Sequence, residues 1–145
     1  MSRMLAIHEF LRTSQVPIRV VAGPPIGAPV RERVTLVVCV VDGTPVLALV
    51  PAPLVVNLER LLSLAGGNEI CLAHDDEEAG SRDWEPIFAD VRLALSHEIV
   101  FAAEAQDEAT VIRWADFARC VRPIMGDFAE PPRDRVGAYR LSYCE

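Results

Sequence analysis

The sequence contains no lysine: all 14 residues in the lysine-plus-arginine count are arginines. The sequence also contains 21 aspartates and glutamates. Complete replacement of lysine by arginine is typical of coding bias rather than of selection at single sites. Arginine stays protonated and cannot act as a general base, so the chemistry available to the chain is restricted. The net charge of -7 argues against a broad electrostatic grip on nucleic acid, since such binding neutralises phosphates with basic groups. We therefore expect no DNA binding, and any contact with RNA should be local.

Long apolar runs are also missing. The most apolar segment, Val34 to Val41, has eight residues with only Thr35 polar, whereas a membrane-spanning helix needs roughly 20. The N-terminus lacks a basic segment followed by an apolar run, as a secretory signal would have. A chain of 145 residues suits one domain with a real core. We expect a soluble cytoplasmic protein that makes no membrane contact.

The four cysteines are spread widely, with no C-x-x-C pair and no histidine at zinc-ligand spacing. The sequence therefore predicts no structural metal and no cofactor. Cys39 and Cys71 lie in apolar strand-like runs, and Cys120 lies on the apolar face of a short helix, where a free thiol behaves as a small hydrophobic group. We expect reduced cysteines that pack in the core.

Hydrophobic periodicity predicts alternating strands and helices. Asp42-Gly43 is a strong hairpin signal, and Asn57 is a good N-cap for a helix that Gly66 ends. The expected strands are 18–21, 34–41, 46–50, 69–73, 87–89, 99–102 and 109–114, and the expected helices are 4–11, 58–65 and 115–121. The run 34–41 should lie at the centre of the sheet, covered on both faces.

The stretch from Pro86 to Pro123 has an apolar strand ending in Asp, a polar turn, I-V-F, a second turn, an amphipathic strand, A-D-F and a closing proline. It resembles the C-terminal half of the YbaK/ProX (prolyl-tRNA synthetase associated) aminoacyl-tRNA deacylase family. The resemblance implies an α+β fold with a mixed, strongly curved, partly open barrel-like sheet of six or seven strands and surrounding helices. It also implies an editing domain over residues 1–123 and a C-terminal extension over 124–145.

Family members work through one lysine on a central strand, which is taken to position the 3′-terminal adenosine and the aminoacyl ester. Counting back from Pro51-Ala52 through the hairpin places that position on Thr35. Because side chains alternate along a strand, Arg33 points to the same face about 7 Å away, and Arg31 is one step further. These arginines could clamp a phosphate or carbonyl without acting as a base. The alternative for Arg33 is a solvated residue at the start of the strand.

The family's G-x-x-x-P loop, whose backbone helps to orient the ester, also differs here. The span from Gly80 to Pro86 has the spacing G-x-x-x-x-x-P, and residues 22–29 are too few for a second family helix. Three departures in one expected pocket point to lost or altered chemistry. Asp90 and Asp116 match the family pattern, and the resemblance implies substrate binding for both. Asp116 also falls in a first helical turn, where a carboxylate stabilises the helix dipole, so a structural role is the alternative.

Three functions follow as hypotheses. The first is a divergent deacylase-like domain that hydrolyses mischarged aminoacyl-tRNA in trans, with the acceptor end of tRNA as its partner. The second is a non-catalytic module on the same fold that binds a small molecule, an RNA end or a protein, because fold does not determine activity. The third is a role in assembly, including a homodimer, through the alternating residues Tyr139, Leu141 and Tyr143.

Overall fold

The structure is a computed structural model, and it describes residues 15–22, 31–73, 86–102 and 108–132. The predicted helix 4–11, the loop from His74 to Asp83, Gly80 and the apolar stripe after Gly137 lie outside these ranges. In the described ranges, no helix combines the length and the apolar character that crossing a membrane requires.

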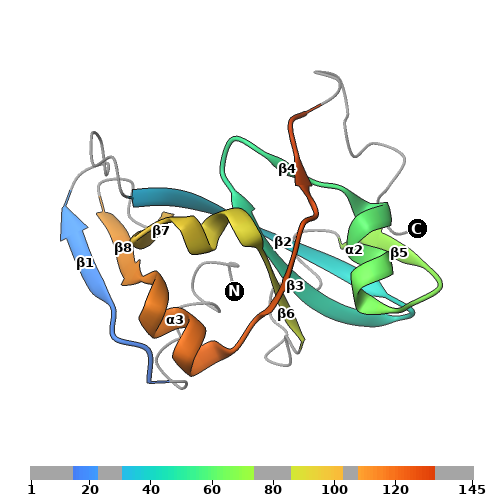
Figure 1. The fold of residues 1–145 in the computed structure, drawn as a ribbon, viewed down its shortest axis with the longest axis horizontal. Coiled ribbons are helices and arrows are strands. Elements are labelled where there is room, and N and C mark those ends of the chain that lie inside the picture. Colours follow the sequence, from blue (N-terminus) through green and yellow to red (C-terminus); the bar gives the residue numbers. More distant parts are fainter. Residues whose placement is uncertain (1–14, 23–30, 74–85, 103–107, 133–145) are drawn as a thin grey trace.

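The chain alternates short strands with two α-helices and one 3₁₀ helix, η1, in the described residues (Figure 1). The strands are β1 (Arg19–Ala22), β2 (Arg31–Val41), β3 (Thr44–Pro51), β4 (Val55–Val56), β5 (Ile70–Leu72), β6 (Ile87–Asp90), β7 (Glu98–Ala102), β8 (Glu108–Arg113), β9 (Ile124–Gly126) and β10 (Ala129–Glu130). The helices are α2 (Leu58–Ala65), η1 (Val91–Leu95) and α3 (Trp114–Val121).

Most of these strands form one mixed, curved sheet. Its path runs β1-β8-β7-β2-β3-β6-β9, and β5 branches off by pairing with β2. The β2–β7, β3–β6 and β6–β9 pairs are parallel, whereas the other pairs of this sheet are antiparallel. The path begins at β1 and ends at β9, so over the described residues the sheet is open. The predicted α+β class and the mixed, curved sheet are confirmed; the path has seven strands, within the predicted six or seven, and β5 adds an eighth strand beside it.

A long hairpin of β2 and β3 forms the middle of the sheet. Its register pairs Val34 with Pro51 and Val41 with Thr44. The turn residues Asp42 and Gly43 have φ values of 49° and 82°, the left-handed conformations that a two-residue hairpin turn requires. The hairpin predicted from Asp42-Gly43 is therefore confirmed.

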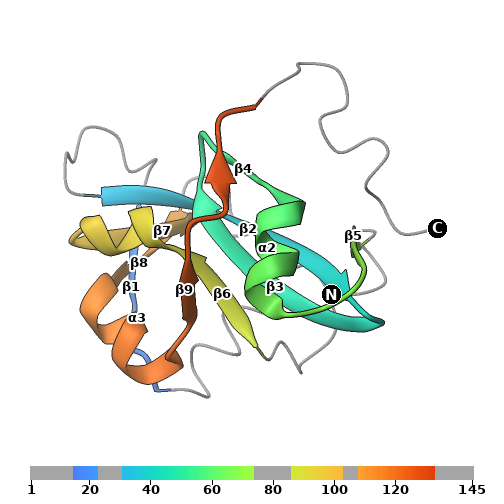
Figure 2. The same ribbon diagram turned by 45° about the vertical axis from the view of Figure 1, so that its right-hand side comes forward.

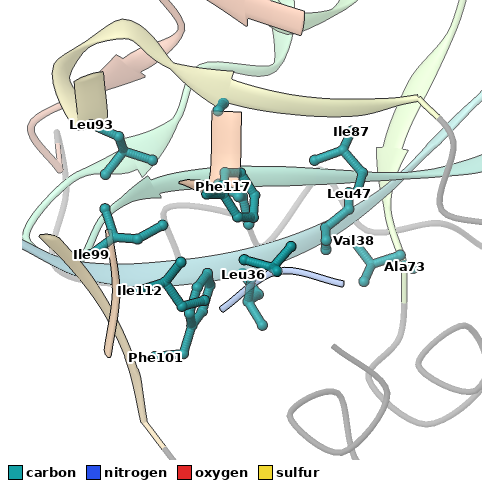
Figure 3. Close-up of a cluster of buried hydrophobic side chains, with 13 residues drawn as sticks. Leu36, Val38, Leu47, Ala73, Ile87, Leu93, Ile99, Phe101, Ile112 and Phe117 are labelled. Carbon is teal, nitrogen blue, oxygen red and sulfur yellow. The ribbon is translucent and has the colours of Figure 1, made fainter. Parts of the chain in front are cut away.

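Side chains that alternate along the hairpin build a core on each face of the sheet. Leu36 and Val38 belong to one core, which Phe117 of α3 completes, as the close-up in Figure 3 shows. Cys39 and Val41 belong to the other core, together with Leu61 of α2. The two helices lie far apart on the sheet in both views (Figures 1 and 2). Strand 34–41 is thus covered on both faces, as its composition predicts.

Helix α2 begins and ends where the sequence indicates. The Asn57 side chain accepts the backbone N–H of Arg60 at 3.1 Å, and Gly66 has a φ of 74°. The N–H of Gly66 donates to the carbonyl of Leu62 at 2.9 Å, which closes the last turn.

The segment after α3 is joined to the rest of the domain. β9 pairs with β6, β10 pairs with β4, and Phe128 between them is fully buried. The sequence pattern predicts neither η1 nor the short strands β4, β9 and β10. The division of the chain after residue 123 stays a prediction, but residues 124–130 belong to the same folded unit.

The cysteine prediction is wrong for one residue. Cys71 is disulfide-bonded, and its partner lies outside the described residues, whereas Cys39 and Cys120 are free thiols. β5 pairs with β2 alone among the described strands, and Cys71 is only half-buried there. Burial raises the pKa of the Cys39 thiol to about 12, as expected of an inert core cysteine.

Candidate functional site

Thr35 and Arg33 are both exposed at the N-terminal half of β2. Thr35 pairs with Val50 of β3, and Arg33 pairs with Val100 of β7 on the other side of the strand. The carbonyl of Arg33 accepts the N–H of Ala52 at 2.8 Å, which extends the hairpin pairing past the end of β3. The backbone around Thr35 is therefore fixed by neighbours on both sides, and its side chain is not sealed in the core.

Alternation places Arg33 and Thr35 on one face of β2, about 7 Å apart. Neither side chain makes a hydrogen bond or ion pair in the described part of the chain. The guanidinium of Arg33 is consequently a cation without a protein counter-ion among those residues. Arg31, the third predicted residue, stands opposite Glu98 in the β2–β7 register.

Asp90 is placed differently from the residues on β2. It is fully buried at the end of β6 and accepts N–H groups from Arg92 at 2.9 Å, Phe128 at 3.0 Å and Ala129 at 2.8 Å. Nη1 of Arg92 adds an ion pair at 3.0 Å. Burial alone would raise the pKa of the Asp90 carboxyl, but these hydrogen bonds outweigh it and hold the pKa below its ordinary value. These contacts give Asp90 a structural role, and its part in substrate binding stays a prediction.

Asp116 lies in the first turn of α3, as predicted, and its carboxylate pairs with Arg119 at 3.1 Å. It also lines a hollow of about 270 Å³ between the start of β1, the ends of β7 and β8, and α3. The other lining residues are Pro17, Ile18, Glu98, Val111 and Arg113. The structure therefore places Asp116 with Glu98 and Arg113, two charged residues that the sequence analysis did not select.

The hollow is separated from Thr35 along the sheet. The Arg33–Val100–Val111 row lies between Thr35 and the row that contains Glu98 and Arg113. Thr35 lies four residues along β2 from Arg31, the residue opposite Glu98, and this separation corresponds to about 13 Å. Pro86 is exposed just before β6, and Gly80 lies outside the described ranges. The structure thus groups the predicted residues into a β2 surface, a hollow beside α3 and a buried aspartate.

The sequence offered one signal for the residues that line this hollow, namely charged residues at the ends of predicted strands. Glu98 opens β7 and Arg113 closes β8, and antiparallel pairing brings them opposite each other. A sequence pattern shows each charge but not the register that joins them. In the described ranges, no group of three or more His, Cys, Asp and Glu residues is arranged to hold a metal ion.

Comparison with solved structures identifies the fold. A protein described as a "putative trans-editing enzyme for prolyl tRNA synthetase" matches with a TM-score of 0.69 at 18% identity, over 88% of this chain and 97% of that chain. A scaffold protein for presenting linear epitopes matches with a TM-score of 0.70, with the same identity and coverage. A "putative signal transduction protein" from Marinobacter aquaeolei VT8 matches with a TM-score of 0.69 at 17% identity, over 90% of this chain but 31% of that one.

No protein-family model matches the sequence, and no curated protein matches it. The resemblance inferred from the sequence is nevertheless confirmed in the fold, because a trans-editing-type structure superimposes over nearly its whole length. The class defined here is therefore an α+β domain that shares its fold with the solved structure described as a "putative trans-editing enzyme".

Proposed function

We propose that this protein is a divergent aminoacyl-tRNA deacylase-like domain that acts on mischarged tRNA in trans, with its site on β2 around Thr35 and Arg33. The exposed position of Thr35 supports this proposal, because the resemblance assigns the family's ammonium group to that position. The shared fold provides independent support.

In this proposal, Arg33 supplies the positive charge near the ester or the terminal phosphate. A guanidinium can bind a phosphate or carbonyl oxygen with two parallel N–H groups, and Arg33 has no partner among the described residues that would compete. The proton that the attacking water loses would move through the ribose hydroxyl and a bound water, since neither Thr35 nor Arg33 can act as a general base at neutral pH.

The loss of the ammonium group predicts slow turnover. Removal of one preorganised electrostatic contact lowers the rate about 10²- to 10³-fold. A deacylase of this kind would therefore be weak, and its remaining activity would depend on Arg33.

The test is a deacylation assay at high enzyme concentration on tRNAs mischarged with proline, alanine and cysteine. The expected result is enzyme-dependent release of at least one amino acid that the Arg33→Ala variant no longer produces. Arg60→Ala, an exposed arginine on α2, is the matched control and should retain the activity.

Absence of turnover on every tRNA would favour a second candidate, a non-catalytic module on the same fold. The absence of lysine from the sequence is the observation that favours it. Filter binding of the uncharged and charged tRNAs then separates an RNA-end binder from a protein with no tRNA contact.

A further inference from the structure

Four of the chain's arginines stand on one face of four neighbouring strands, β1, β8, β7 and β2 (Figure 1). One row across these strands consists of Arg19, Val111, Val100 and Arg33. The next row on the same face consists of Arg113, Glu98 and Arg31. Residues that pair across strands, and residues two apart along a strand, share a face. We call this surface, which also carries Thr35, the arginine face.

The arginine face is positive although the whole chain is negative. Among the strand residues of this face, Glu98 is the one carboxylate, and it already has a partner. Asp116 of α3 lies near Arg113 but is paired with Arg119 at 3.1 Å. Four arginines and Glu98 leave an excess of three positive charges on these strands, whereas the net charge of the chain is -7. A local excess of the opposite sign indicates a surface for an anionic partner.

Two of these arginines are open to a ligand. Arg33 and Arg113 are exposed, and neither makes a hydrogen bond or ion pair with the residues that the structure describes. Arg113 stands two strands across and two residues along from Arg33, and this offset corresponds to roughly 12 Å. A strand of a nucleic-acid duplex carries one phosphate per roughly 3.4 Å of helix axis, so the offset spans three or four phosphates.

The arginine face is continuous with the proposed deacylation site. Arg33 belongs to both, because Thr35 is two residues further along the same face of β2. We propose that the arginine face binds the phosphate backbone of an RNA strand, whose end lies at Thr35 and Arg33 and whose next phosphates lie at Arg113. The planar guanidinium donates two parallel N–H groups to one phosphate. The choice of RNA over another polyanion rests on the proposed function, since Arg33 is shared with that site.

The experiment measures the binding of a single-stranded RNA that carries no amino acid. A fluorescein-labelled RNA of about 12 nucleotides is titrated with the full chain at salt concentrations from about 20 to 200 mM, and anisotropy reports binding. For single strands, the logarithm of the binding constant falls against the logarithm of salt with a slope of about -0.7 per phosphate contact. An excess of three positive charges predicts about three contacts and a slope of roughly -2.

Variants at Arg113 test the surface away from Thr35. Arg113→Gln should weaken binding about two- to fivefold at low salt and make the slope shallower by about 0.7, because one phosphate contact is lost. Arg113→Lys keeps the charge and should keep the slope. Arg60→Gln removes an exposed arginine of α2 and is the matched control, which should bind as the wild type does. Thermal unfolding shows whether each variant is folded.

Four results would overturn the proposal. The first is no binding of the RNA at low salt, and the second is an unchanged affinity and slope in folded Arg113→Gln. The third is an equal loss in Arg60→Gln, which would mean that binding follows net charge alone. The fourth is equally tight binding of poly-L-glutamate that also depends on Arg113, which would make the face a site for an acidic protein.

This test is separate from that of the proposed function, because the RNA probe carries no ester. RNA binding that depends on Arg113 in a protein without deacylation activity would leave the arginine face standing. Deacylation by a protein whose RNA binding is insensitive to Arg113→Gln would leave the proposed function standing and remove the arginine face.

Discussion

Oδ2 of Asp90 accepts the backbone N–H of Ala129 at 2.8 Å, although 39 residues separate the two in the sequence. The same oxygen accepts the N–H of Phe128 at 3.0 Å. One buried carboxylate therefore holds the segment after α3 against the end of β6 and places Phe128 in the core. This contact, together with the pairing of β10 with β4, positions β10.

Asp90→Asn should destabilise the fold by roughly 3 kcal/mol, because an amide cannot accept from all the buried donors that surround the carboxylate. The free energy of unfolding in urea measures the effect. Asp127→Asn is the matched control, since Asp127 also contacts Nη1 of Arg92 but is 61% exposed. Loss of the Asp127–Arg92 ion pair should lower the free energy of unfolding by under about 1 kcal/mol, as for other exposed ion pairs. Equal effects of the two substitutions would contradict the role given to Asp90.

The same carboxylate predicts acid sensitivity. The pKa of Asp90 is lowered in the folded protein from its ordinary value of 3.8, so folding favours the ionised form. Its contribution to stability is complete above the unfolded pKa and is lost as pH falls through the lower folded pKa. We expect the wild type to lose stability below about pH 4 more steeply than Asp90→Asn does. Urea unfolding at several pH values between neutrality and pH 2.5 measures both slopes, and parallel slopes would exclude this linkage.

Asn57→Ala should lower the free energy of unfolding by about 1–2 kcal/mol, because the Asn57 side chain caps α2. It also donates from Nδ2 to Glu130 at 3.0 Å, and this contact joins α2 to β10. Asn68→Ala is the control, since Asn68 is exposed and its backbone N–H, which the substitution keeps, donates to Asp42. Thermal unfolding of both variants gives the comparison. A loss for Asn68→Ala as large as that for Asn57→Ala would remove the case for the cap.

Thr35→Lys tests the β2 surface by gain of function. If Thr35 occupies the position of the family lysine, an ammonium group there should raise the deacylation rate on the order of 10²-fold. The assay compares single-turnover release of amino acid from mischarged tRNA. Thr44→Lys, an exposed threonine on β3 at the far end of the hairpin, should leave the rate unchanged. Equal rates for Thr35→Lys and wild type would show that the missing cation does not limit the deacylation rate of this protein.

Local sequence signals were sufficient where a few neighbouring residues decide the structure. Asp42-Gly43 adopts the left-handed conformations of a tight hairpin, and Asn57 caps a helix that Gly66 ends. The fold class followed from the resemblance of residues 86–123. Very short strands such as β4, β9 and β10 gave no such signal, because two or three residues are stable as strands only through their partners.

The sequence by itself determined the periodicity of the central hairpin, the capping of α2 and the absence of any lysine for the chemistry of the site. Only the tertiary structure decided which charges meet. Asp90 and Asp116 both appeared as candidate substrate ligands, but one is buried under Phe128 and Ala129, and the other lies beside Arg113 and Glu98. The physical reason is that strand register and chain crossing bring distant residues together, and neither is encoded in local spacing.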